Sequence, residues 1–80
     1  MIYDIHSEAD FDTLVGGGEG WVLLDFFASW CRPCKMMAPV LEKADAAMGG
    51  EVKFCRVDVD AMEDFAEPFQ LVGVPTFILF

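Results

Sequence analysis

The chain has 80 residues, of which 55% are hydrophobic, and its 14 acidic and 5 basic side chains give a formal net charge of −9. This length fits a single domain, residues 1–80, with a real core. The shortage of basic residues argues against nucleic acid or an anionic membrane as a partner, because no basic patch can meet phosphates. No stretch approaches the roughly 18 to 20 apolar residues of a membrane span. Residues 1–4 lack the features of a signal peptide, so we expect a cytoplasmic protein.

The first part of the chain alternates between strand and helix patterns. Residues 2–5 read as a short strand. Ser7 and Asp10 resemble a capping box at the start of a helix that continues through Val15. The glycine-rich run 16–20 ends this helix in a loop, which is not a phosphate-binding loop because it leads into a strand. Residues 21–28 are almost continuously apolar, which is typical of a strand buried on both faces of a sheet.

The second part continues the alternation. A long helix is predicted over residues 31–48, with an inner side made of Met36, Met37, Val40, Leu41, Ala44 and Met48. Residues 52–59 form a third strand, and Asp60 is expected to cap a short helix that runs to about Glu67. Residues 76–80 form a fourth, wholly apolar strand. The order βαβαβαβ predicts an α/β fold in which helices sandwich a central sheet.

Cys31 and Cys34 lie where the second strand gives way to the long helix. In the first turn of a helix, unpaired backbone N–H groups and the helix dipole stabilise an anion, and a thiolate is the anion available. Pro33 suits this turn because its missing N–H is not needed there. Cys34 lies one turn on, faces the same way and can reach the first sulfur. The pair therefore indicates dithiol–disulfide exchange.

Several motifs, taken together and in order, resemble the thioredoxin family. They are Asp25-Phe26, Ala28-x-Trp30-Cys31-x-Pro33-Cys34-Lys35, Pro39 in the long helix, Val57-Asp58-Val59-Asp60, and Gly73-Val74-Pro75-Thr76. The match covers essentially the whole chain and includes the spacing between motifs. It implies a thioredoxin-like fold with a central mixed β-sheet, lacking the last strand and the C-terminal helix of the family.

The resemblance implies a thiol–disulfide oxidoreductase that reduces protein disulfides. Cys31 would attack the disulfide of a partner protein to form a mixed disulfide, and Cys34 would resolve it. Asp25 would accept the proton of Cys34, which agrees with its place in an apolar strand, where burial raises the pKa of a carboxyl. Substrate-binding residues would be Trp30, Arg32, Pro33, Val74 and Pro75, the last as the cis-proline of the family.

The resemblance also implies the partners. These are disulfide-containing proteins and, as electron donor, a flavin-dependent thioredoxin reductase, and the chain itself needs no cofactor. A bare strand edge at Thr76–Phe80 invites pairing with another chain, so a homodimer is expected as one outcome, beside a naturally short chain and a truncated one.

Arg32 stands where the most common motif of the family has glycine. Its guanidinium favours a neighbouring thiolate, so we expect a lower pKa for Cys31 and a somewhat more oxidising couple than in the glycine version.

Other readings of the same residues stay open. The chain is alternatively a thioredoxin-like binding or scaffold module without efficient turnover. A zinc site could be formed by Cys31, Cys34, Cys55 and His6, although zinc motifs usually bring a second pair at its own tight spacing. Cys55 is otherwise a buried, inert thiol. Asp25 could instead be an ion-pair partner of Arg56 or Lys35.

Overall fold

The computed structural model describes residues 1–18 and 20–80, so Glu19, in the predicted loop 16–20, lies outside the described residues. In the described part, one mixed sheet is formed by β1 (Ile2–Asp4), β2 (Trp21–Phe27), β3 (Val52–Asp58) and β4 (Thr76–Leu79), in the order β1-β3-β2-β4. β1 and β2 run parallel to β3, and β4 runs antiparallel to β2. The central strands β2 and β3 carry the fully buried side chains Leu24, Phe26 and Val57.

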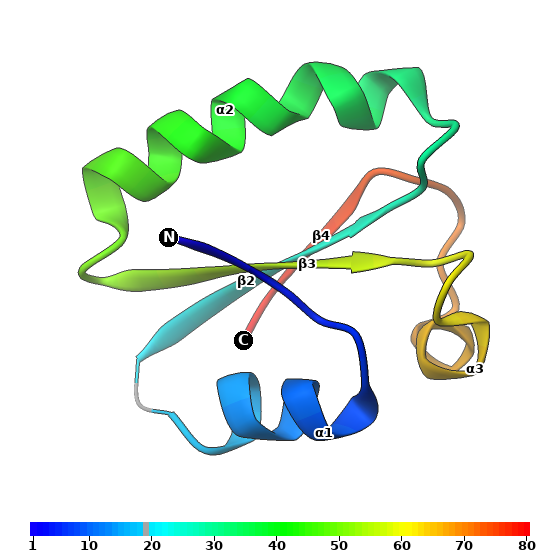
Figure 1. Ribbon diagram of the computed structural model, residues 1–80, viewed down its shortest axis with the longest axis horizontal. Helices are drawn as coiled ribbons and strands as arrows, with labels where there is room; N and C mark the ends of the chain where they lie inside the picture. Colours follow the sequence, from blue (N-terminus) through cyan, green and yellow to red (C-terminus); the bar gives the residue numbers. More distant parts are fainter. Residues whose placement is uncertain (19) are drawn as a thin grey trace.

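Helices cover both faces of this sheet (Figure 1). α2 (Arg32–Met48) crosses one face, whereas α1 (Glu8–Phe11) and α3 (Glu63–Ala66) lie on the other. α1 continues into a π-helical turn, Asp12–Gly16, and α3 continues into a 3₁₀ turn, Glu67–Phe69. The predicted α/β sandwich with a mixed central sheet is therefore confirmed. No helix in the described ranges is long and apolar enough to cross a membrane.

Phenylalanine rings attach the short helices to the sheet. Phe11 of α1 packs against Phe65 of α3 with ring centroids 5.0 Å apart, and Phe26 of β2 packs at the same distance against Phe69. Phe80 also lies against Phe11, at 5.8 Å. Helices of one or two turns are unstable by themselves, so this aromatic packing holds them in place.

The start of α1 follows the predicted capping pattern. The backbone N–H of Asp10 donates to the Ser7 hydroxyl at 3.1 Å. The Asp10 carboxylate in turn accepts the backbone N–H of His6 at 3.0 Å. Two of the backbone donors at this helix start are thereby satisfied by side chains.

The predicted inner side of α2 is partly wrong. Its buried stripe runs through Cys34 and Leu41, two turns apart, whereas Met36, Val40 and Met48 are exposed. A helix lying on a sheet buries only one narrow stripe, and these three side chains fall outside it. The hydrophobic character of these three residues therefore led to the wrong prediction that they are buried.

The predicted cap of the short helix at Asp60 is also wrong. The carboxylate of Asp58, the last residue of β3, accepts the backbone N–H of Asp60 at 2.9 Å and so shapes this turn. α3 begins later, after Met62, with no side-chain cap. The Asp60 side chain is thereby free to face the neighbouring loop, where it meets Trp30.

Candidate active site

Cys31 is the N-cap residue of α2, at the point where the chain leaves β2 and turns into the helix. Its backbone is extended, and its sulfur accepts the backbone N–H of Cys34 at 3.1 Å. The sulfur thus occupies the position that a serine or aspartate oxygen takes in an ordinary cap. This N–H and the positive end of the helix dipole both favour a negative charge on the sulfur.

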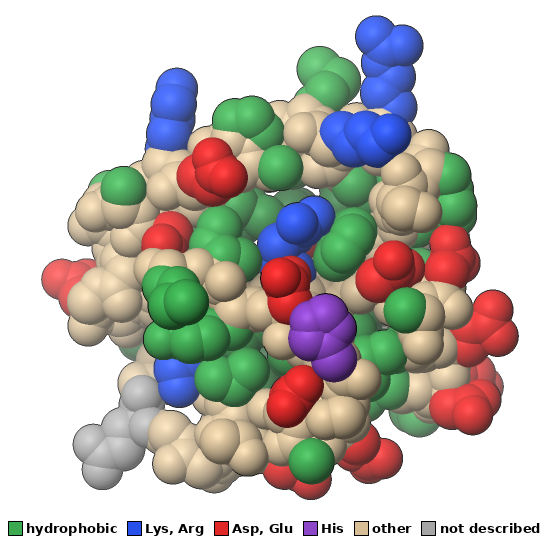
Figure 2. Space-filling model, viewed as in Figure 1, with side chains coloured by type: hydrophobic (Ala, Val, Ile, Leu, Met, Phe, Trp, Pro, Cys, Tyr) green, Lys and Arg blue, Asp and Glu red, His purple; other side chains and the backbone are tan. Residues whose placement is uncertain are grey.

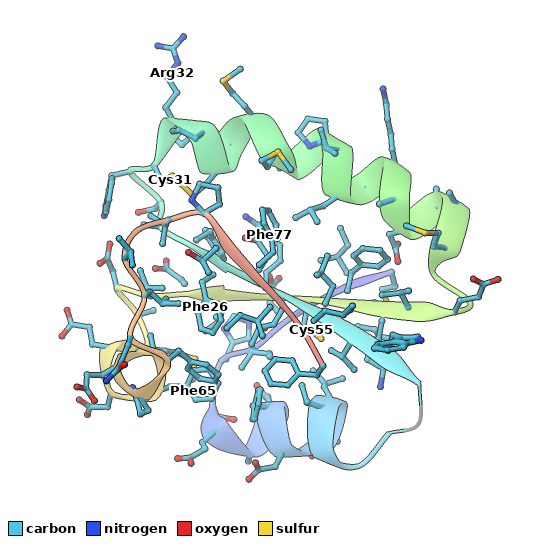
Figure 3. All side chains as sticks on the ribbon, turned by 180° about the vertical axis from the view of Figure 1, so that it is seen from behind. Phe26, Cys31, Arg32, Cys55, Phe65 and Phe77 are labelled. Atoms are coloured by element: carbon cyan, nitrogen blue, oxygen red, sulfur yellow. A yellow bond between two sulfur atoms is a disulfide. The ribbon has the colours of Figure 1, made fainter. Side chains whose placement is uncertain are left out.

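Cys31 and Cys34 form a disulfide, with their Cα atoms 5.3 Å apart. The prediction that the second sulfur reaches the first is confirmed. Both cysteines are buried, whereas the neighbouring Trp30 is 69% exposed. Figure 3 shows Cys31 at the end of α2, close to the loop that leads into β4.

That loop brings Val74 and Pro75 beside the disulfide. The Cys31 sulfur lies 3.6 Å from the Val74 carbonyl oxygen, and the Val74–Pro75 peptide bond is cis. The cis bond agrees with what the resemblance implied for Pro75. The two residues are 43 and 44 positions along the chain from Cys31, and the antiparallel pairing of β4 with β2 brings them there.

Asp25 lies in β2, the strand that leads toward the cysteine pair, and is almost fully buried. Burial raises the pKa of its carboxyl, and the hydrogen bond and positive charge of Arg56 oppose that rise. Arg56 Nε lies 3.3 Å from Asp25 Oδ2, whereas Asp25 Oδ1 is buried with no hydrogen-bond partner. The two residues are paired in the register of β2 and β3, and the guanidinium also stacks on Phe27, 3.9 Å from its ring centroid.

Trp30 is held at the edge of the site by Asp60. The indole N–H donates to the Asp60 carboxylate at 2.7 Å. This bond fixes an exposed aromatic ring next to Cys31 without burying it. An apolar surface therefore lies ready beside the sulfur.

The comparisons with known proteins agree with this geometry. The Thioredoxin family model matches residues 3–80. The chain is 36% identical over 80 residues to "Thioredoxin-2" of Saccharomyces cerevisiae. The aligned region covers all of this chain and 76% of that protein.

The chain belongs to the thioredoxin family. The crystal structure of thioredoxin NaTrxh from Nicotiana alata superposes with a TM-score of 0.89 at 33% identity, covering 99% of this chain and 70% of that one. The chain is also 48% identical over 74 residues to the "Bifunctional thioredoxin reductase/thioredoxin" of Mycobacterium leprae. The aligned region covers 92% of this chain and 16% of that protein. Its Cys31–Cys34 pair is accordingly the redox pair of a thiol–disulfide oxidoreductase.

The structure bears on the other readings proposed for Asp25, Cys55 and the zinc set. Arg56, and not Lys35, is the cation that pairs with Asp25. Cys55 is a buried free thiol in β3, and burial raises its pKa, as expected for an unreactive cysteine. The zinc set is not assembled, since the described residues contain no group of three or more His, Cys, Asp or Glu side chains placed to hold a metal ion.

Of the predicted substrate-binding residues, Trp30, Val74 and Pro75 come together around Cys31, while Arg32 and Pro33 lie exposed in the first turn of α2. Other residues of this surface were not predicted from the sequence. Glu63, Glu67 and Leu71 line a groove next to Trp30. They belong to the segment around α3, whose fold against the active site depends on the aromatic packing described above.

Proposed function

We propose that this thioredoxin reduces protein disulfides by an attack from Cys31 that Cys34 completes. The observation that carries this assignment is the position of the Cys31 sulfur at the start of α2, where it accepts the N–H of Cys34. Only this sulfur is the N-cap group of the helix, and the helix start favours its thiolate.

Each step conserves atoms and electrons. The Cys31 thiolate attacks one sulfur of the substrate disulfide, forms a mixed disulfide, and releases the other substrate sulfur as a thiolate. The Cys34 thiolate then attacks the Cys31 sulfur, which closes the Cys31–Cys34 disulfide and releases the second substrate thiolate. The substrate gains two electrons, and the Cys31–Cys34 pair loses them.

Asp25 is proposed to take the proton from Cys34 before the second attack. Cys34 is buried, so water has little access to its thiol. The Asp25 carboxyl has a raised pKa, which makes it a better proton acceptor than an exposed aspartate. One of its oxygens is held by Arg56, and the other has no partner, which supports a proton-accepting role for Oδ1.

The substrate is proposed to bind across Trp30, Arg32, Pro33, Val74 and Pro75. The Val74 carbonyl lies beside Cys31, where an extended substrate segment could pair with the backbone. Trp30 supplies an exposed apolar surface next to the attacking sulfur, and Arg32 supplies a positive charge.

Disulfide reduction of insulin, driven by dithiothreitol, tests the assignment. The wild type should accelerate it, and Cys31→Ser should abolish the acceleration. Cys34→Ser should also stop turnover but should leave the substrate covalently attached to Cys31, visible by mass spectrometry. Binding of insulin without acceleration would support the alternative of a scaffold module and contradict the proposed activity.

We further propose that a flavin-dependent thioredoxin reductase returns electrons to the disulfide, so that the chain acts in electron transport. The Mycobacterium leprae relative, whose name joins a thioredoxin reductase to a thioredoxin, supports this pairing. Reduction of the Cys31–Cys34 disulfide by such a reductase, followed as NADPH consumption, tests it. No consumption with several reductases would contradict it.

The proposed compartment is the cytoplasm. A dithiol that works as a reductant must be kept reduced, and the cytosol does so. Cell fractionation with an antibody to the chain tests this placement, and recovery in an oxidising compartment would contradict it.

A homodimer through the edge strand is a separate proposal. β4 lies at the edge of the sheet in the described chain, and Leu79 on it is 56% exposed. Such an edge can pair with a second copy. Light scattering should then give the mass of two chains, and the mass of one chain across the micromolar range would contradict it.

A further inference from the structure

An open groove of about 400 Å³ lies between Trp30 and α3. Its apolar lining includes Trp30, Val59, Leu71 and Val74. Two carboxylates, Glu63 and Glu67, also line it. An apolar groove with a few polar groups at its border is a common form of binding site.

The groove adjoins the redox pair. Val74 lines the groove, and its carbonyl oxygen lies 3.6 Å from the Cys31 sulfur. Trp30, on the other side of the groove, precedes Cys31 in the chain and is fixed by its bond to Asp60. A protein segment whose cysteine reacts with Cys31 therefore has its neighbouring residues over the groove.

The carboxylates of Glu63 and Glu67 lie on the same side of α3. Glu63 opens α3 and Glu67 follows its last residue, one helical turn later, so their side chains lie on the same side. Like charges at this spacing weaken a helix. None of the described residues that line the groove is Lys, Arg or His. The negative potential of the pair is therefore uncompensated within the groove.

Basic side chains lie on the α2 side of the redox pair. Figure 2 shows Lys and Arg side chains along α2, with an acidic one among them, and Asp and Glu side chains over α3 and in the region of α1. In Figure 3, Arg32 points away from the sheet on the α2 side of Cys31, and α3 lies on the opposite side. The two groove carboxylates therefore lie on the α3 side of Cys31, and Arg32 lies on the other side.

We propose that the groove selects substrate segments that carry a Lys or Arg near the reactive cysteine. The segment would place an apolar side chain against Trp30 and Leu71 and its basic side chain between Glu63 and Glu67. This inference rests on the proposed disulfide reduction and names its preferred class of substrate.

Three disulfide-bonded peptides test the preference. They share an apolar residue after the reactive cysteine and differ at one later position, which is Lys, Gln or Glu. With the reduced wild type, the Lys peptide should react about fivefold faster than the Gln peptide, and the Glu peptide should react more slowly than both. The differences should shrink when salt rises from about 0.01 M to 1 M, because the interaction is electrostatic.

Two double variants separate the groove from the net charge. Glu63→Gln/Glu67→Gln should react equally with all three peptides. Asp12→Asn/Asp64→Asn removes as many charges from residues outside the groove and should keep the wild-type preference.

Equal rates for the three peptides with the wild type would overturn the inference, and so would an equal loss of preference in both double variants. A preference that survives Glu63→Gln/Glu67→Gln would overturn it as well. If even the Gln peptide were not reduced, the proposed reaction itself would fail, and this inference with it.

Discussion

At the scale of single residues, Asp25 shows how the surroundings of one side chain change its acidity. Burial raises the pKa of its carboxyl, and Arg56 reduces that rise without removing it. A carboxyl that is costly to bury is thus retained in the core, with one of its two oxygens unpaired among the described residues. This combination is typical of a functional site, since it costs stability.

Asp25→Asn should slow the release of the substrate from the mixed disulfide by about 100-fold near neutral pH, which is the usual contribution of a general base. The rate should recover as pH rises, because water and hydroxide then take the proton from Cys34. Stopped-flow measurement of the second step at several pH values checks this. An unchanged rate at neutral pH would show that another group accepts the proton.

The same variant should stabilise the fold at neutral pH, by on the order of 1 kcal/mol, since a neutral amide avoids the desolvation cost of the buried carboxylate. The pKa of Asp25 is raised in the folded state, so the wild type loses stability as pH rises above the ordinary carboxyl pKa and through the raised one. The gain from Asp25→Asn should therefore vanish at acidic pH. Urea unfolding at a series of pH values measures it, and a constant gain would contradict the assignment.

We expect Arg32 to influence the reduction potential of the Cys31–Cys34 couple. Arg32→Gly removes a positive charge next to Cys31, so it should make the couple more reducing, by about 10 to 20 mV if the exposed charge contributes 0.5 to 1 kcal/mol. Equilibration with glutathione measures the potential. Lys43→Ala, which removes a charge farther along α2, should change it less. An equal shift in the control would assign the effect to net charge.

At the scale of elements, the bond between Trp30 and Asp60 joins the loop before α2 to the turn after β3. Asp60→Ala should leave the thiol chemistry intact but lower kcat/KM for peptide disulfides by about two- to fivefold, since one hydrogen bond contributes about 0.5 to 1.5 kcal/mol. A small-molecule disulfide, which does not need the Trp30 surface, should react at the wild-type rate. Equal losses with both substrates would contradict a role in substrate binding.

The elements also show how far sequence reasoning reaches. The strands and α2 follow from local patterns, and the CxxC spacing indicated the disulfide, because both depend on residues close in the chain. The partner of Asp25 required knowing that β2 and β3 pair in one register. The role of Asp60 required knowing where β3 ends, and the exposure of Met36 and Val40 required knowing how α2 lies on the sheet. Contacts between distant segments are not visible in local periodicity.

At the scale of the whole molecule, Phe69 connects the layers, since its ring meets the rings of Phe11, Phe26 and Phe65. Phe69→Ala should destabilise the fold by about 3 kcal/mol or more, as expected for loss of a packed aromatic ring. Phe77→Ala, at a ring that is 36% exposed, should cost less. Urea unfolding measures both. Similar costs would contradict the central place of Phe69 in the core.

The whole fold serves to place one sulfur at the start of a helix. Titration of the reduced protein, by ultraviolet thiolate absorbance and by the pH dependence of Cys31 alkylation, tests this claim most directly. We predict that Cys31 ionises at least about one pH unit below the value near 8.5 of a free cysteine. Ionisation at or above that value would contradict the account.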